Sequence, residues 1–323
     1  MTETDMLIGG DQAAARPAIQ AALLEWFAAA GRDLPWRHTR DPYRIMVSEI
    51  MLQQTQVDRV IPKYHAFLAA FPTLEALAAA PTAEVIRAWS GLGYNRRAVN
   101  MQRTARAVLE EHGGQFPRDL PALLRLPGIG PYTAGAIACF AFEQDVGFMD
   151  TNIRRVVQRL FVGPEEAGLA GEVQLQALAQ AAVPGGRGWH WNQAIMELGA
   201  LICTAAAPAC WRCPVRTFCR AYATRRAADE QLFSAEQPAM PRPKRRVAER
   251  REAPYAGSNR FYRGRAVEAL RELPPGQALA LRDLGGRLKL DFGADDLPWL
   301  QTLVEGLARD GLLVIEDGAA RLP

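Results

Sequence analysis

Four of the five cysteines lie close together in the second half of the 323-residue chain and indicate a metal centre. Their order is Cys203-x6-Cys210-x2-Cys213-x5-Cys219. Because the N-terminus has no pattern of an export signal, disulfides are not expected. Four such thiolates suit a [4Fe–4S] cluster or a zinc ion, and this spacing differs from the paired C-x2-C knuckles typical of zinc. The fifth, Cys139, lies in an apolar run and is expected to be a buried small hydrophobic residue.

Two acidic residues occupy positions where a carboxylate could do proton or charge chemistry. Glu49 is set among apolar residues of a helical pattern. It is therefore either an ordinary helix-surface residue or a desolvated acid with a raised pKa. Asp150 directly precedes another helical pattern and has the residue type of a normal N-cap. From the residues alone, both the structural and the functional interpretations stay open.

Residues 126–134, Leu-Pro-Gly-Ile-Gly-Pro-Tyr-Thr-Ala, predict a tight turn between two helices. Gly128 and Gly130 lack a Cβ, so the backbone there can adopt positive φ and approach another surface closely. Pro131 suits the first turn of a helix. Free N–H groups at such a turn form a nest for an anion, most simply a phosphate. A plain helix–helix turn with a glycine cap is the alternative.

Helical periodicity dominates residues 1–220, and no strand pattern of any length occurs there. One helix is expected over 16–30 and another from Tyr43 to Val60, and the apolar segment from Pro131 to Phe142 is expected to be the buried centre of the fold. A second glycine turn, residues 91–97, carries Tyr94 beside two arginines. This turn is either a wedge for a duplex or a packed turn with a solvated rim.

The composition changes after residue 222. Residues 223–263 are predicted to form a linker. Its basic part either lies along the phosphates of a nucleic acid or is solvated and has no partner. Helical runs at 264–272, 280–288 and 296–309 are followed by two short strand patterns joined by an Asp-Gly turn. This order predicts a small winged-helix-like domain over 264–323, which would bind either DNA or a protein.

Net charge and hydropathy exclude little. Lys and Arg together number 38 against 35 acidic residues, so the net charge of +3 is weak support for a nucleic-acid partner. No apolar run approaches the roughly 18 residues needed to span a bilayer. The expectation is a cytoplasmic, nucleoid-associated protein that does not enter a membrane.

The motifs of residues 20–222 resemble the helix-hairpin-helix DNA glycosylases, and among these the adenine glycosylases of the MutY type. The matching segments occur in family order. They are Leu-Pro-Trp-Arg at 34–37, Ser-Glu-Ile-Met-Leu-Gln-Gln-Thr at 48–55, Gly-Leu-Gly-Tyr at 91–94, the hairpin at 126–134, Asp-Thr-Asn at 150–152 and the four cysteines.

The resemblance implies a mostly α fold. Two α-helical subdomains form a catalytic domain over 16–222, with DNA and a flipped base in the cleft between them. The domain includes the loop 203–219 that carries a [4Fe–4S] cluster. We expect a monomer that acts on double-stranded DNA containing a mismatch.

The resemblance also implies the catalytic roles. Glu49 is similar to the acid that protonates the leaving adenine and then handles water, and Asp150 to the residue that stabilises the cationic sugar. Such cleavage resembles glycoside hydrolysis, in which two carboxylates divide these tasks. Tyr132 is similar to a residue on the sugar side of the site and Asn152 to one that orients Asp150. Relatives that use a lysine at the position of Tyr132 form a Schiff base, so the tyrosine implies a monofunctional hydrolase.

The DNA-binding residues implied by the resemblance come from three turns. Insertion into the base stack, or contact with the base opposite, is expected of Gln54, Thr55, Leu92 and Tyr94, and phosphate binding of the hairpin residues Gly128, Ile129 and Gly130.

Two departures from the family pattern leave alternatives for the excised base. A winged-helix-like sequence stands in the place of the usual Nudix-like domain that helps to recognise 8-oxoguanine. Residues 31–43, together with Tyr132, are also similar to thymine mismatch glycosylases. The expected reaction is release of adenine opposite 8-oxoguanine or guanine. The alternatives are a thymine or uracil mismatch glycosylase and a non-catalytic iron–sulfur DNA-binding regulator.

Overall fold

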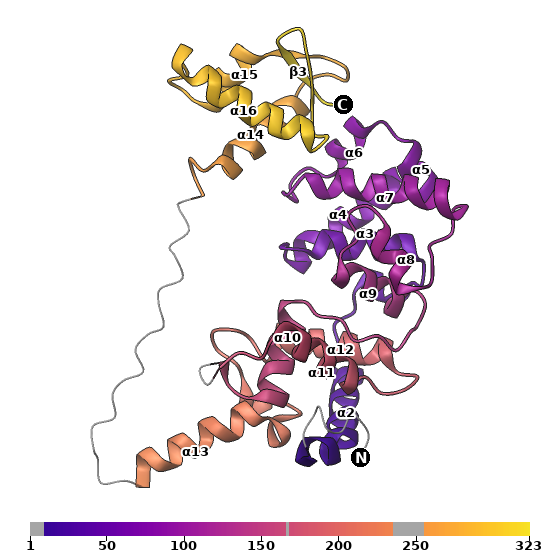
Figure 1. Ribbon diagram of the computed structural model, residues 1–323, viewed down its shortest axis with the longest axis vertical. Helices are drawn as coiled ribbons and strands as arrows, with labels where there is room; N and C mark the ends of the chain where they lie inside the picture. The colour runs from indigo at the N-terminus through magenta and orange to yellow at the C-terminus, as the bar shows by residue number, and fades with distance from the viewer. Residues whose placement is uncertain (1–9, 166–167, 235–254) are drawn as a thin grey trace. The chain divides into compact units, whose positions relative to one another are not determined.

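The computed structural model describes residues 10–165, 168–234 and 255–323 (Figure 1). Up to residue 234, the regular elements in the described part are all helical. They are α2 (Gly10–Ala30), α3 (Pro42–Leu52), α4 (Val57–Ala70), α5 (Leu74–Ala79), α6 (Thr82–Ala88), α7 (Arg96–His112), α8 (Leu120–Arg125), α9 (Pro131–Phe140), α10 (Thr151–Val157), α11 (Glu172–Ala182), α12 (Gly188–Leu201) and α13 (Arg220–Ser234). Short helical turns cover Pro35–His38, Gln158–Val162, Cys210–Arg212 and Arg216–Phe218. The expectation of a mostly α fold is confirmed.

The chain divides into two compact units. The first unit comprises Met1–Ile45, Arg118–Leu124 and Gly130–Arg242, as far as these segments are described. The second comprises Met46–Pro117, Arg125–Ile129 and Pro243–Pro323, with the same limit. Both units are therefore assembled from segments that are distant in the sequence.

Helix α9 is the buried centre of the first unit, as the apolar sequence predicts. Every side chain from Thr133 to Phe140 is buried, and Cys139 among them is fully inaccessible.

A buried acid, Glu197 on α12, accepts hydrogen bonds from the Arg32 side chain at 2.7 Å and from Arg37 at 2.9 Å. Burial alone would raise the pKa of Glu197, but these two guanidinium groups outweigh it and lower the pKa. The ion pair thus ties the segment after α2 to α12.

The second unit contains α4 to α7, most of α3 and the C-terminal elements. The latter are α14 (Asn259–Arg271), β1 (Leu279–Ala280), α15 (Leu281–Leu288), α16 (Leu297–Arg309), β2 (Val314–Glu316) and β3 (Ala319–Arg321). The strands form an antiparallel sheet of order β1-β3-β2. The hairpin is as expected, whereas the two-residue strand β1 has no sequence pattern and is recognised only through its pairing with β3.

Two expected boundaries are wrong. A continuous helix from Tyr43 to Val60 is replaced by α3 and α4, because the chain turns at Gln54, which has φ 58°. Helix α13 continues to Ser234, beyond the point where the linker was expected to begin, and residues 235–254 of that expected linker lie outside the described part. None of the described helices is long and apolar enough to cross a membrane.

Candidate active site and nucleic-acid interface

Asp150 is the N-cap of α10 in the first unit. Its Oδ1 accepts a hydrogen bond of 2.6 Å from the backbone N–H of Ile153, and its Oδ2 accepts one of 3.2 Å from the Asn152 amide. Burial raises the pKa of Asp150, although both hydrogen bonds and the charge of Arg155 oppose the rise. The cap was foreseen in the sequence. The structure adds that this carboxylate is partly buried, enough to raise its pKa, which an exposed cap would not show.

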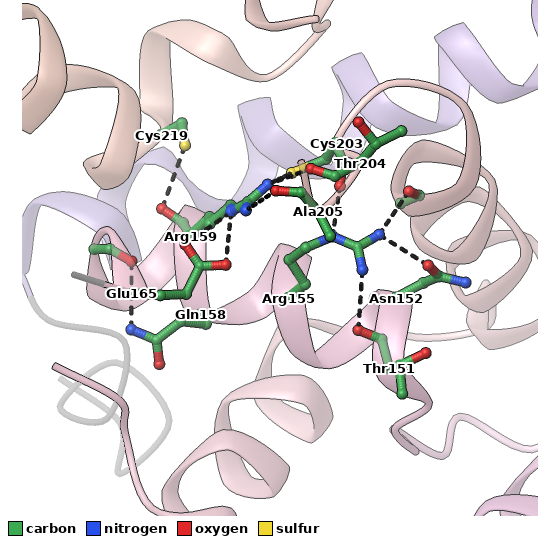
Figure 2. Close-up of polar contacts among 12 residues, drawn as sticks. Thr151, Asn152, Arg155, Gln158, Arg159, Glu165, Cys203, Thr204, Ala205 and Cys219 are labelled. Atoms are coloured by element: carbon green, nitrogen blue, oxygen red, sulfur yellow. Dashed lines mark hydrogen bonds and ion pairs between the residues drawn. The ribbon is translucent and has the colours of Figure 1, made fainter. Parts of the chain in front are cut away.

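Arg155 fixes the orientation of Asn152 (Figure 2). It donates hydrogen bonds of 2.8 Å to the Asn152 Oδ1, 2.7 Å to the carbonyl of Gly199 and 2.6 Å to the carbonyl of Cys203. Since the amide oxygen of Asn152 faces the guanidinium, its NH2 group faces Asp150. A Cβ at Gly199 would lie 2.7 Å from the Asn152 Cβ, so the glycine is what lets α12 approach this closely. No local sequence pattern indicates this role of Arg155, because two of its partners lie 44 and 48 residues away.

The four cysteines surround one small cavity in the first unit, of about 30 Å³, lined by Cys203, Cys210, Cys213 and Cys219. Burial raises the pKa of the Cys213 thiol to about 12, and the neighbouring cysteines raise it as well. In the described part of the chain, no three His, Cys, Asp or Glu side chains are arranged to hold a single metal ion. The four thiols nevertheless line one shared cavity.

Arg159, in the helical turn Gln158–Val162 that follows α10, lines the same cavity and contacts the cysteine loop. Its guanidinium lies 3.6 Å from the Sγ of Cys203 and donates a hydrogen bond of 2.7 Å to the carbonyl of Thr204, while its Nε lies 2.9 Å from Glu165 (Figure 2). The Cys219 Sγ lies 3.3 Å from the Arg159 carbonyl oxygen. A buried cation beside sulfur would stabilise thiolate ligands. Hence the residues present fit a thiolate-bound group.

Glu49 lies on α3 in the second unit and is only 2% exposed. Its neighbours Ser48 and Ile50 are buried as well. This burial excludes the interpretation of Glu49 as a solvated helix-surface residue and leaves that of a desolvated acid.

Two turns of the second unit expose Gln54 and Tyr94 in left-handed conformations, with φ of 58° and 46°. Arg97 connects these turns. Its guanidinium donates hydrogen bonds of 2.6 Å to the carbonyls of Ile50 and Gln53 and longer ones, of 3.2 Å, to the carbonyls next to Tyr94. Burial lowers the pKa of Arg97 to about 10. This arginine therefore holds the turns in shape and is not available to a phosphate, which the sequence did not reveal.

The remaining expected interface residues differ in exposure. Tyr94 is 46% exposed, whereas Leu92 and Ile129 are each 5% exposed and pack inward. Thr55 donates to the carbonyl of Gln53 at 3.3 Å within its own turn. Leu92 and Ile129 thus support the turns, and their direct contact with DNA stays a prediction.

The hairpin between α8 and α9 uses its two glycines differently. Gly128 has φ +81°, and a Cβ there would lie 2.6 Å from the Cβ of Asn100. Gly130 has φ −92°, and a Cβ there would meet no atom within 4 Å. Thr104 holds the turn by donating a 2.6 Å hydrogen bond to the carbonyl of Pro127. The structure therefore corrects the expectation of positive φ at Gly130 and leaves its outer side open.

Tyr132, on the first turn of α9, is half-buried. Its ring packs edge-on against Phe148, with centroids 5.6 Å apart. In all, the first unit holds Tyr132, Asp150, Asn152 and the cysteines, and the second holds Glu49 and the exposed turns.

Comparison with known proteins identifies a family match and several relatives of this chain. Residues 47–182 match the model of the HhH-GPD superfamily base excision DNA repair protein. The adenine DNA glycosylase of Mycolicibacterium smegmatis is 42% identical over 251 residues, which cover 77% of this chain and 79% of that protein. The human adenine DNA glycosylase is 44% identical over 228 residues, 68% of this chain but only 41% of that protein. A thermostable thymine-DNA glycosylase structure matches with TM-score 0.61 and 34% identity, over 65% of this chain and 98% of that one.

The different roles of the two hairpin glycines predict different costs of substitution. Gly128→Ala should lower the free energy of unfolding by roughly 2 kcal/mol or more, because it adds both left-handed strain and a clash. Gly130→Ala, the matched control, should change it by less than about 0.5 kcal/mol. Urea unfolding of both variants measures this, and equal stabilities would contradict the assigned geometry.

Proposed function

The chain belongs to the HhH-GPD superfamily of base excision DNA repair proteins, and we propose that it is a monofunctional DNA glycosylase that hydrolyses the N-glycosidic bond of adenine mispaired with guanine or 8-oxoguanine. The observation that carries the proposal is the pair of desolvated acids, Glu49 and Asp150. Binding alone would require neither. The adenine-specific names of the relatives at 42% and 44% identity support the choice of base.

The two acids suit the two demands of the reaction. Loss of a purine passes through an oxocarbenium-like sugar, and the base must leave in a neutral form. Glu49 would donate a proton to the adenine ring and afterwards activate water. Asp150, held by the α10 N-terminus and by Asn152, would stabilise the cationic sugar without having to reorganise.

The absence of a suitable amine in the sequence supports hydrolysis without strand cleavage. The three lysines of the chain are Lys63, Lys244 and Lys289, and none lies in the hairpin or beside Asp150. Tyr132 stands where the lysine of bifunctional relatives would be, and a phenol cannot form a Schiff base with the sugar.

The exposed turns support DNA as the substrate. Gln54 and Tyr94 would fill the space that a flipped base leaves, and the open side of Gly130 would let the hairpin backbone approach a phosphate. Thr55 would contact the opposite base. Unstacking is easiest at a mismatch, so these contacts favour mispaired adenine.

A [4Fe–4S] cluster is the cofactor that the cysteine loop supports best. The ligands would be Cys203, Cys210, Cys213 and Cys219, with Arg159 beside them, and their sequence spacing differs from the paired C-x2-C knuckles typical of zinc. Bound there, the cluster would cross-link a loop that has little apolar sequence of its own.

Release of thymine from T:G mispairs is the second candidate function. It is supported by the thermostable thymine-DNA glycosylase, to which the chain is 34% identical over 98% of that protein's length. Duplexes carrying A:8-oxoguanine, A:G, T:G, U:G and A:T distinguish the two. We expect adenine release from the first two duplexes, with strand cleavage only after alkali. Thymine release from T:G without adenine release would establish the second function instead.

The same duplexes test the role of Glu49 as the general acid. Glu49→Gln should abolish base release while the affinity for the A:G duplex stays within about tenfold, because the substitution removes a proton donor and little shape. Retained turnover by Glu49→Gln would exclude it as the general acid.

Replacement of one thiol tests the cofactor. Cys213→Ser should lose most of its iron and acid-labile sulfide, because three thiolates and a hydroxyl hold a cluster poorly. Cys139→Ser, whose side chain lies in the apolar core, is the control and should keep the iron. Wild-type protein that holds zinc and no iron would refute the cluster.

A further inference from the structure

The C-terminal module, residues 255–323, is packed against the helices that carry the exposed Tyr94 turn. Ile86 of α6 and Val99 of α7 share a buried apolar cluster with Leu270, Leu300 and Leu312 of the module. Nothing in the sequence indicated that these two parts would share a core.

Polar contacts fix this packing next to the turn. Arg271 of the module donates a hydrogen bond of 3.0 Å to the carbonyl of Ile86 and one of 2.8 Å to the Oδ1 of Asn95, the residue after Tyr94. Arg96 lies 3.3 Å from Asp310. The C-terminal end of α14 is thereby held beside the turn, and Asp310, which also pairs with Arg263, holds the first half of this helix.

A groove of about 860 Å³ lies between the exposed turns and the module, within the second unit. One side includes Gln54, Tyr94 and Arg97, and the other includes Tyr255, Asn259 and Arg260. The residues expected to occupy the base stack thus share one surface with residues of the module.

Among the arginines that line this groove, Arg260 is the one that lies against two aromatic rings. Its guanidinium lies 4.8 Å from the ring centroid of Tyr94 and 5.2 Å from that of Tyr255. In the described part of the chain it forms no ion pair, whereas Arg263 is paired with Asp310. Stacking on two rings restrains the guanidinium while its N–H donors stay free at the edge.

We infer that the module and the Tyr94 turn form a composite groove for the DNA strand opposite the flipped base, and that Arg260 contacts this strand. Exposed aromatic rings combined with arginine are the chemistry that holds unstacked nucleotides. The inference rests on the proposed function, since it is the flipping of a base that leaves the opposite nucleotide without its partner. Arg260 would donate to acceptor atoms of that nucleotide, either on its base edge or on its phosphate.

Binding to a duplex that needs no catalysis tests the groove. The probe is a duplex with a tetrahydrofuran abasic analogue opposite guanine, bound by the full chain. Arg260→Ala should weaken binding roughly 5- to 20-fold, as expected for loss of one good arginine contact. Because Arg260 is exposed, the substitution should leave the melting temperature unchanged. Arg282→Ala is the matched control. It removes the same charge from an exposed position of the module outside the groove, and its affinity should stay within about twofold.

A second duplex, with cytosine opposite the analogue, locates the contact. A larger loss with guanine than with cytosine supports a base contact. Equal losses, with a salt slope reduced by about 1, support a phosphate contact on the same strand. Unchanged affinity of Arg260→Ala on both duplexes, or equal losses for Arg260→Ala and Arg282→Ala, would overturn the inference. Should adenine release fail while the effect of Arg260→Ala persists, the proposed base would be wrong and the groove would stand.

Discussion

The structure depends most on keeping a carboxylate, Asp150, in a desolvated place next to the N-terminus of α10. Burial raises its pKa, and the Ile153 N–H and the Asn152 amide act in the opposite direction by stabilising the anion. The orientation of Asn152 is set in turn by Arg155, which also binds the carbonyl of Cys203. The position of the acid is therefore connected by hydrogen bonds to the cysteine loop, so that the order of this loop and that of the site are physically linked.

In the second unit, two exposed turns have residues in left-handed backbone conformations, Gln54 and Tyr94, and these turns need to be stabilised. A single guanidinium, that of Arg97, satisfies carbonyls of both turns. Gln54 and Tyr94 are exposed as a result, and Glu49 is buried in the same unit. The C-terminal module adds to this frame through its shared core and places Arg260 on the ring of Tyr94. The second unit thus carries the buried Glu49, the exposed Gln54 and Tyr94, and Arg260.

Local patterns predicted much of this arrangement. The N-cap Asp150, the buried α9 and the cysteine spacing could be predicted because each is decided within a few residues of sequence. The roles of Arg155, Arg97 and Arg260 could not be predicted, because each has partners that are distant in the chain. An arginine on a helix has the same local sequence pattern whether it faces solvent or a carbonyl. The break between α3 and α4 was missed for a related reason, since left-handed backbone at a glutamine has no propensity signal.

The central claim is that Asp150 acts as a fixed negative charge that matches a cationic sugar. The most direct measurement is the affinity for two duplexes that differ only in the nucleotide at the adenine position, a cationic pyrrolidine analogue or a neutral tetrahydrofuran, each opposite guanine. A site complementary to the transition state should bind the cationic analogue at least about tenfold more tightly. Asp150→Asn should lose this preference and keep the affinity for the neutral duplex. An equal preference in wild type and variant would show that Asp150 is only a helix cap.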